Sequence, residues 1–440
     1  MDRRYIPLKN WKTAVCAAAV RKERAEYMTE NARANSIEKV QKNVKAEGKA
    51  DQAFKSRPDK KRSRCPVSKK CGGCTMIDVP YEQQTQEKQQ LVEDLIGTFG
   101  RVDPIIRMKN PDHYRNKVTS VFAPDRKGRP VCGIYKAGTH EVVPVKSCLL
   151  EDLRADRIIQ TVFTLMESFK LRVYDEDRGT GLIRYVQVRT AHSTRQVMVT
   201  LVTGQTVFPP AKKFVNALLK RHPEITTVVQ NINDKQTTMV LGDREKVLYG
   251  PGYIEDVLCK KRFRISSRSF YQVNSLQTEK LYNIALDYAG FSGKERILDA
   301  YCGIGTIGII ASDRCREVLS VELNPEAVAD AKVNAKLNSV QNVEVYKNDA
   351  GRFMRDMAAK KEKLDVLFMD PPRSGASEEF LGAALELSPA KIVYVSCEPT
   401  TLARDLTVLT EGGYVMKKAV PVDMFPYTEG VETVVLLTHN

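Results

Sequence analysis

From about residue 276, the sequence alternates between short apolar runs and segments with helical periodicity. This alternation predicts a doubly wound α/β sheet of mainly parallel strands, a fold that binds ligands at the carboxyl ends of its strands. The expected helices are 276–290, 306–312, 325–338, 350–359, 376–387 and 399–409. The expected strands are 295–300, 317–321, 342–346, 364–369 and 391–395, with a final pair near 413–420 and 431–437.

The composition upstream of this region divides the chain further. Residues 1–64 contain 18 Lys and Arg against 8 Asp and Glu, within a chain of 440 residues and net charge +15. Such a basic arm attracts polyanions, most commonly nucleic acid, although a solvated tail has the same composition. We expect a basic, partly helical N-terminal extension (1–60), a β-rich central domain (61–260) of antiparallel strands with a few helices, and the α/β domain (261–440). Strands are expected in the central domain at 118–122, 131–135, 182–189, 196–202, 226–231 and 237–241.

The sequence predicts neither a membrane span nor export, although the run 14–20 follows basic residues and faintly resembles a signal peptide. No apolar run approaches the roughly 20 residues that a span requires, and the alanine-rich run 14–20 is short and lacks a clear cleavage pattern. Several of the ten cysteines are clustered, which favours metal binding or catalysis in a reducing compartment over disulfides. We therefore expect a cytoplasmic protein. We also expect a monomer, although the sequence itself does not give the oligomeric state.

A glycine-rich turn follows the first strand of the α/β domain. Gly303, Gly305 and Gly308 match the pattern G-x-G-x-x-G, and Glu322 follows at the end of the next strand. Glycine lets the backbone approach a ligand closely, and the carboxylate can accept ribose hydroxyls. The pattern alone also suits a nicotinamide or flavin enzyme. Asp299 at the strand end and the cysteine before the first glycine favour S-adenosylmethionine.

Two later strands of this domain also end in reactive side chains. The run Met369-Asp-Pro-Pro-Arg373 places Asp370 in a stiff turn, and Ser396-Cys-Glu-Pro399 delivers the Cys397 thiol where proline ends a strand. A thiol at this edge of the sheet suggests a nucleophile, whereas a free cysteine taken alone is more often a small buried hydrophobic residue. The neighbouring motifs favour the nucleophile.

A second group of cysteines lies in the central domain. Cys65, Cys71 and Cys74 have the spacing C-x5-C-x2-C, and Cys148 is a suitable distant fourth ligand. Four thiolates can hold an iron–sulfur cluster or zinc, and the spacing does not distinguish the two.

Taken together, these motifs resemble the RNA 5-methyluridine (uracil-5-) methyltransferase family, and in particular its iron–sulfur 23S ribosomal RNA members. The matching stretches run in family order: Ser267-Arg-Ser-Phe-Tyr-Gln-Val-Asn274, Leu298-Asp-Ala-Tyr-Cys-Gly-Ile-Gly305, Val321-Glu-Leu-Asn324, Asp370-Pro-Pro-Arg373, Ser396-Cys-Glu-Pro399, Asp423-Met-Phe-Pro426 and Val431-Glu-Thr-Val434. The resemblance implies Cys397 as the nucleophile and Glu432 as the base. It implies S-adenosylmethionine contacts from Gln272, Tyr301, Glu322, Asp370 and Asp349. It also implies a 4Fe–4S cluster on the four cysteines.

The family chemistry explains why these residue types are needed. A thiolate that adds to carbon 6 of uracil makes carbon 5 electron-rich, so that it can accept a methyl group, and a carboxylate then removes the proton from carbon 5. The base must first be flipped out of the RNA, with Arg373, Phe270 and Tyr271 as candidates for lining its pocket. Glu398 and Gly430 depart from the family pattern, which commonly has Asn and His there.

The partner implied by the cysteine cluster is 23S ribosomal RNA, with transfer RNA as the alternative. Arg115, Asn116 and Lys117 also resemble a family stretch and are candidates to face the RNA. Two other functions remain open: a catalytically silent RNA-binding relative and a nicotinamide oxidoreductase. The second leaves the Ser-Cys-Glu-Pro run unexplained.

Overall fold

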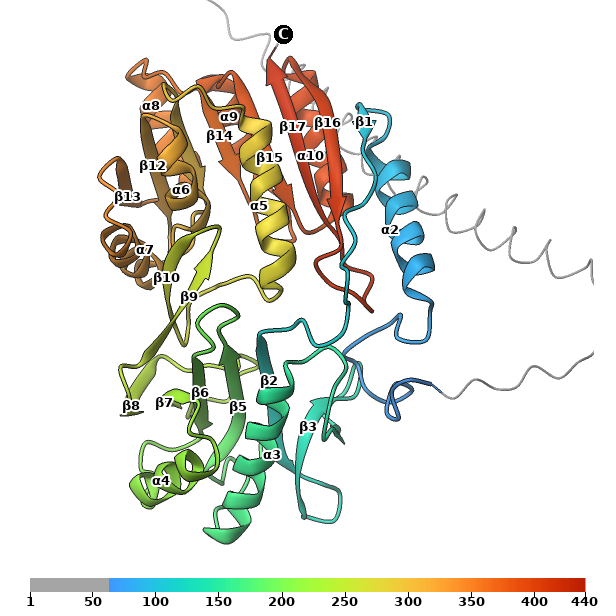
Figure 1. Ribbon diagram of the computed structural model, residues 1–440, viewed down its shortest axis with the longest axis vertical. Coiled ribbons are helices and arrows are strands. Elements are labelled where there is room, and N and C mark those ends of the chain that lie inside the picture. The colour runs from blue at the N-terminus through green and yellow to red at the C-terminus, as the bar shows by residue number, and fades with distance from the viewer. Residues whose placement is uncertain (1–62, 440) are drawn as a thin grey trace, which may run out of the picture. The chain divides into compact units, whose positions relative to one another are not determined.

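The structure is a computed structural model that describes residues 63–439. Contacts divide the chain after residue 62, and the described residues belong to the second unit, Ser63–Asn440. The basic, partly helical extension expected at 1–60 lies outside the described residues. The second unit contains an eight-stranded sheet, a seven-stranded sheet and a two-stranded ribbon (Figure 1).

The eight-stranded sheet forms the α/β part of the chain. Its order is β1-β16-β17-β15-β14-β11-β12-β13. Strands β11 to β15 run parallel to their neighbours in this group, as the alternation of strands and helices predicts, whereas β17 pairs antiparallel with both β15 and β16. The strands are β1 (Arg101–Val102), β11 (Arg296–Ala300), β12 (Glu317–Glu322), β13 (Val343–Lys347), β14 (Val366–Met369), β15 (Lys391–Ser396), β16 (Tyr414–Val422) and β17 (Glu432–His439).

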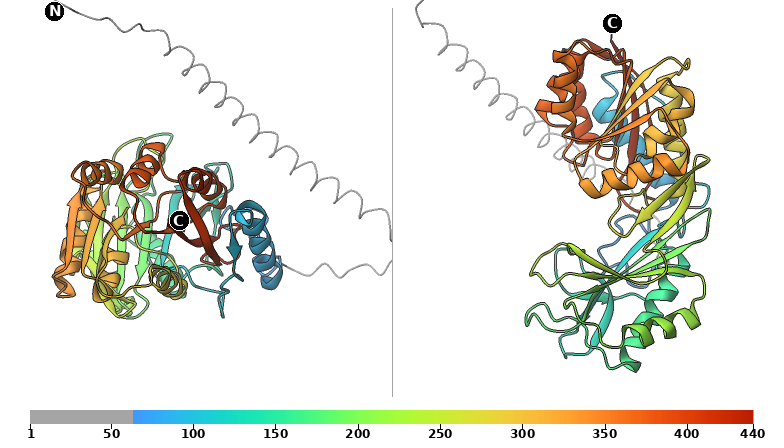
Figure 2. Two further views of the ribbon diagram at one scale, coloured as in Figure 1. Left: turned by 90° about the horizontal axis from the view of Figure 1, so that it is seen from above. Right: turned by 90° about the vertical axis from the view of Figure 1, so that its left-hand side faces the viewer.

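Helices cover both faces of this sheet (Figure 2). One face packs against α5, α6 and α7, and the other against α2, α8, α9 and α10. Alternate residues of each strand enter the two cores: Ile297 faces the first and Leu298 the second, as strand geometry requires. The helices are α2 (Tyr81–Ile96), α5 (Ser275–Ala289), α6 (Thr306–Ala311), α7 (Pro325–Leu337), α8 (Ala350–Ala359), α9 (Glu378–Leu387) and α10 (Pro399–Glu411).

Helix α2 joins this layer from far upstream in the chain. Its residues Val92 and Ile96 are fully buried in the second core, and the helix packs against α10. The eight-stranded part is therefore completed by residues from outside 261–440, which include β1 at its edge.

The seven-stranded sheet has the order β4-β3-β2-β5-β6-β7-β8 and carries α3 and α4 on one face. Its pairs are antiparallel except β6 with β7, which are parallel and connected through α4. The elements are β2 (Lys117–Pro124), β3 (Pro130–Tyr135), β4 (Val142–Pro144), α3 (Leu153–Ser168), β5 (Ile183–Thr190), β6 (Val197–Thr203), α4 (Ala211–Arg221), β7 (Ile225–Ile232) and β8 (Arg244–Tyr249). The ribbon of β9 (Tyr253–Leu258) and β10 (Lys261–Ser266) follows.

One expected strand of the central region, 237–241, is wrong. Asn233 donates its side-chain amide to the carbonyls of Met239 and Val240. The side chain of Asn231 donates to the carbonyl of Gly242 and accepts from its backbone N–H. These side chains close the segment into a loop, and the strand that pairs with β7 begins only at Arg244. None of the helices between residues 63 and 439 is both long and apolar enough to span a membrane.

Candidate active site

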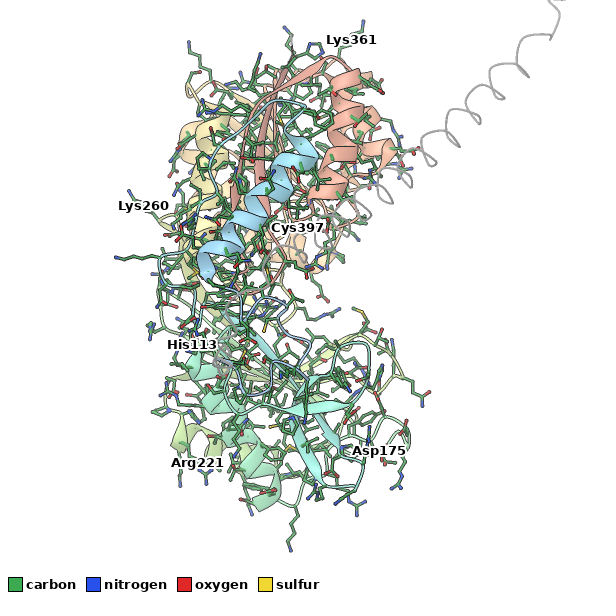
Figure 3. All side chains as sticks on the ribbon, turned by 90° about the vertical axis from the view of Figure 1, so that its right-hand side faces the viewer. His113, Asp175, Arg221, Lys260, Lys361 and Cys397 are labelled. Carbon is green, nitrogen blue, oxygen red and sulfur yellow. The ribbon has the colours of Figure 1, made fainter. Side chains whose placement is uncertain are left out.

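Four acidic or nucleophilic side chains meet at one edge of the eight-stranded sheet. Asp299 lies near the end of β11, Asp370 follows β14 directly, Cys397 follows β15 directly, and Glu432 begins β17. Strand pairing brings Ala300 opposite Met369, and Ser396 opposite Thr433. The antiparallel β17 therefore starts where its parallel neighbour β15 ends. Figure 3 marks Cys397 at this end of the sheet.

The carboxyl groups of this site are buried and electrostatically coupled. Burial and then the negative charge of Asp370 raise the pKa of Glu432 well above its ordinary value, and the Arg373 cation opposes this shift. The side chain is 2% exposed, and its Oε2 atom has no hydrogen-bond partner among the described residues. Burial also raises the pKa of Asp370 to about 7. The raised pKa values of these two carboxyl groups bring them towards the range in which side chains exchange protons near neutral pH, which suits acid–base chemistry.

The thiol of Cys397 lies in the same electrostatic environment. Burial raises its pKa to about 12, with further contributions from the negative charges of Glu432 and Asp370, while Arg373 lowers it. At neutral pH this raised pKa favours the thiol over the thiolate, so the nucleophilic thiolate forms only when the proton leaves.

A cavity beside these residues has the composition expected of a cofactor pocket. Three predicted contacts, Gln272, Tyr301 and Asp370, line it. The remaining lining residues are Leu258, Phe270, Tyr271, Tyr282, Asp299, Cys302, Gly303, Ile304, Thr306 and Ile307. The mixture of aromatic rings, apolar side chains and a few carboxyl and amide groups fits a ligand with an adenine ring and a charged amino-acid end.

The glycine turn shapes this pocket. Gly303 and Gly305 have φ values of +55° and +83°, which favour glycine. Gly308 donates its backbone N–H to Asp299 Oδ2 at 2.8 Å, and a Cβ there would lie 2.7 Å from the hydroxyl of Ser320. Burial raises the pKa of Asp299 to about 7. The conformation therefore depends on glycine at these positions and places a buried carboxyl group against the turn.

Glu322 and Asp349 are not among the residues that line this cavity. Glu322 accepts hydrogen bonds from the backbone N–H of Gly303 (3.1 Å) and of Asn324 (2.7 Å), so it lies directly beside the glycine turn. Asp349 is the N-cap of α8 and accepts from Arg352 N at 2.9 Å. Both carboxylates thus accept hydrogen bonds from backbone N–H groups, Glu322 at the glycine turn and Asp349 at the start of α8.

Tyr282 on α5 is a cavity residue that sequence reasoning missed. Its hydroxyl lies 3.3 Å from that of Thr306, and burial raises its pKa, with contributions from the charges of Asp370, Asp299 and Glu432. No local motif marks this tyrosine, because it reaches the site only through the packing of α5 on the sheet.

Cys65, Cys71, Cys74 and Cys148 line a single cavity in the central region. The rest of its lining is mainly apolar and includes Ile77, Ile134 and Leu150. The backbone N–H of Gly73 donates to Cys71 Sγ at 3.3 Å, and that of Leu150 donates to Cys148 Sγ at 3.4 Å. Thiols with an apolar surround and amide donors fit an iron–sulfur group. Within residues 63–439, however, no group of three or more His, Cys, Asp or Glu side chains has the arrangement of a metal site.

The expectation that Asn116 faces RNA is wrong. Asn116 is 4% exposed and donates its side-chain amide to Gln272 O and Ser275 Oγ, each at 3.0 Å. Its backbone N–H also donates to Val273 O at 2.8 Å. This residue therefore supports the backbone that carries Gln272, which lines the cavity beside the glycine turn, and it has almost no exposed surface to offer to a partner.

Comparison with known proteins identifies the family of this chain. The model of a family described as tRNA (Uracil-5-)-methyltransferase matches residues 80–440. An RNA methyltransferase of Bacillus cereus is 40% identical over 407 residues, which make up 91% of this chain and 88% of the relative. An RNA methyltransferase of Clostridium tetani is 39% identical over 408 residues, 92% of this chain and 88% of the relative.

A solved structure is also similar over most of the chain. It is the crystal structure of Pyrococcus abyssi tRNA (uracil-54, C5)-methyltransferase in complex with S-adenosyl-L-homocysteine, with a TM-score of 0.69 and 25% sequence identity. The alignment covers 84% of this chain and 86% of that one. The resemblance carried by the sequence motifs is thereby confirmed, together with the α/β methyltransferase fold and the enzyme class. By sequence and by structure, this chain belongs to the tRNA (uracil-5-)-methyltransferase family.

Proposed function

We propose that this enzyme methylates carbon 5 of a specific uridine in 23S ribosomal RNA through a covalent adduct between Cys397 and the uracil ring. The observation that carries the proposal is the convergence of Cys397, Glu432 and Asp370 at one sheet edge beside the cofactor cavity. A transfer RNA uridine is the alternative substrate, since the same site would act on either RNA.

In this proposal Cys397 and Glu432 act in sequence. The Cys397 thiolate adds to carbon 6 of uracil, and carbon 5 becomes the nucleophile. Gln272, Tyr301, Glu322, Asp370 and Asp349 would hold S-adenosylmethionine, which would supply the methyl group from its sulfonium sulfur and leave as S-adenosylhomocysteine. Glu432 in its carboxylate form then takes the proton from carbon 5, and the bond between sulfur and carbon 6 breaks to release Cys397. The raised pKa of Glu432 makes it a stronger base than an ordinary carboxylate.

We further propose that the four cysteines hold a 4Fe–4S cluster, within a central RNA-binding domain drawn from about 61–260 and ahead of a catalytic domain of 261–440 that α2 and β1 complete. The common cavity of Cys65, Cys71, Cys74 and Cys148 supports this ligand set. Methyl transfer exchanges no electron, so the cluster would serve the structure or the placement of RNA. Its presence also favours ribosomal over transfer RNA, as the sequence resemblance implies.

The test is methylation of separate in-vitro transcripts of 23S ribosomal RNA and of transfer RNA, followed by mapping of the modified uridine. We expect 5-methyluridine at a defined position of the ribosomal transcript and none with Cys397→Ser. Methylation of transfer RNA alone would reject the ribosomal substrate, and full activity of Cys397→Ser would reject the covalent mechanism.

A further inference from the structure

The segment that delivers Glu432 is the loop of residues 423–431 between β16 and β17. Glu432 is the first residue of β17, and its Oε2 atom makes no hydrogen bond to the described residues. Its position therefore depends on the backbone: on the pairing of Glu432 with Val422 of β16 and on the loop that leads into β17. The contacts that hold this loop thus contribute to where the carboxyl group points.

A buried ion pair fixes the start of the loop. Lys88 of α2 places its Nζ atom 2.7 Å from Asp423 Oδ1, and the two side chains are 2% and 0% exposed. The same Nζ donates to Phe425 O at 3.0 Å. On the other side, Gln277 of α5 donates to Asp423 O at 3.1 Å. The loop thus begins between two helices that come from distant parts of the chain.

Tyr427 in the middle of the loop is held at both its backbone and its hydroxyl. Its φ of +67° is unusual for a residue other than glycine and must be maintained by its surroundings. The backbone N–H groups of Thr75 and Met76 donate to Tyr427 O at 3.2 and 3.0 Å. Arg64 Nη1 donates to the Tyr427 hydroxyl at 2.8 Å, and this hydroxyl donates to Asp112.

These contacts come from the immediate neighbours of the cysteines. Arg64 precedes Cys65, and Thr75 follows Cys74. Tyr427 also belongs to the apolar cluster against which Cys65, Cys74 and Cys148 pack. A change in the geometry of the cysteine site would therefore act directly on the backbone that holds Tyr427.

We propose that the cysteine segment (residues 64–76) and Tyr427 form a positioning device for Glu432, so that filling of the four-cysteine site with iron and sulfide supports proton removal from carbon 5. This inference rests on the proposed function. Addition of Cys397 to the ring does not use the loop, because Cys397 is carried by β15 and not by residues 423–431. The device therefore controls the last step of the reaction and leaves the first steps intact.

The first test separates these steps with two RNAs. A 5-fluorouridine RNA reports addition and methyl transfer, because fluorine at carbon 5 leaves no proton to remove. A uridine RNA reports complete turnover. The variant is Tyr427→Phe, which removes the hydroxyl bonds to Arg64 and Asp112. The matched control is Tyr414→Phe, which also removes one buried hydroxyl bond (to Pro389 O, 2.7 Å) but lies at the far end of β16.

For Tyr427→Phe we expect unchanged trapping by the fluorinated RNA. Turnover on uridine RNA should be slower by up to about 10²-fold, which is the effect of a misplaced catalytic group. A protein–RNA adduct that survives denaturing electrophoresis should accumulate. Tyr414→Phe should leave both rates unchanged. A parallel loss of trapping and turnover, or no loss in either, would overturn the positioning role. Failure of the unmodified protein to form the fluorinated adduct would instead reject the proposed function itself.

The second test addresses the cysteine site without using activity. The full-length protein is compared metal-free and after anaerobic incubation with ferrous iron and sulfide, by hydrogen exchange of peptides that cover 423–431. We expect iron uptake and slower exchange in this loop, with no change in β6 of the central sheet. Absence of uptake, or equal exchange in the two forms, would overturn the link between the cysteine site and the loop.

Discussion

The reactivity of Cys397 provides a quantitative test of the active-site electrostatics. Its pKa is raised from 9.0 to about 12, first by burial and then by Glu432 and Asp370. At neutral pH the thiolate population is therefore lower by about 10³ than for an ordinary cysteine, but a thiolate of higher pKa is intrinsically more nucleophilic, with a Brønsted slope of about 0.4–0.5. The two effects together predict alkylation slower by about 30- to 60-fold.

The assay is alkylation of the free enzyme by iodoacetamide between pH 7 and pH 10, with the Cys397 peptide quantified by mass spectrometry. Because the pH stays below the pKa of the thiol, we expect about a tenfold rise in rate per pH unit with no plateau in this range. Arg373→Met should slow the reaction further, since the Arg373 cation lowers the pKa of Cys397. A plateau below pH 9, or faster alkylation in Arg373→Met, would refute the reasoning. Cys397→Ser identifies the labelled peptide.

Three further predictions concern the base, the ion pair and the glycine turn. Glu432→Gln should slow turnover by about 10²- to 10⁴-fold, as expected for loss of a general base, and leave an RNA adduct visible by denaturing electrophoresis; unchanged turnover would contradict its role. Lys88→Met should lower the free energy of unfolding by about 3–5 kcal/mol, because it leaves Asp423 buried without its cation. Urea denaturation measures this loss, which Asp423→Asn in the same chain should partly restore; an unaltered unfolding midpoint would contradict it. Gly305→Ala should lower the free energy of unfolding by about 1–2 kcal/mol, because the backbone there is left-handed. It should also weaken S-adenosylmethionine binding, measured by calorimetry, since the added Cβ lies 3.0 Å from Ile309 Cδ1; unchanged affinity would show that the turn does not shape the pocket.

Much of the catalytic half was predictable because its signals are local. Periodicity placed the strands and helices of 276–437, and the residues after the strands identified the edge where a ligand would bind. Two departures had non-local causes. The loop at 237–241 is closed by the side chains of Asn231 and Asn233, and the parallel pairing of β6 with β7 depends on α4 crossing over the sheet. Short strand patterns carry no information about either.

The candidate site divides in the same way. Cys397, Asp370 and the glycine turn are evident in the sequence, because each follows an apolar strand directly and lies in a short motif that is uncommon at the end of a strand. Tyr282 and Asn116 are not evident, since Tyr282 reaches the cavity only through the packing of α5, and Asn116 acts only through its hydrogen bond to the backbone of Gln272. Burial and hydrogen-bond partners are properties of the assembled core, and they decided that Asn116 supports Gln272.

The sequence by itself determined the family, the order of strands and helices in the catalytic half, and the chemical groups available for the reaction. Only the tertiary structure decided that the cysteine segment and α2 hold the loop in front of Glu432, since these contacts join residues 335 to 363 positions apart. The physical reason is burial. The ion pair of Lys88 with Asp423 is retained in an apolar interior because both charges are paired there, and no local pattern records which distant segment supplies the partner.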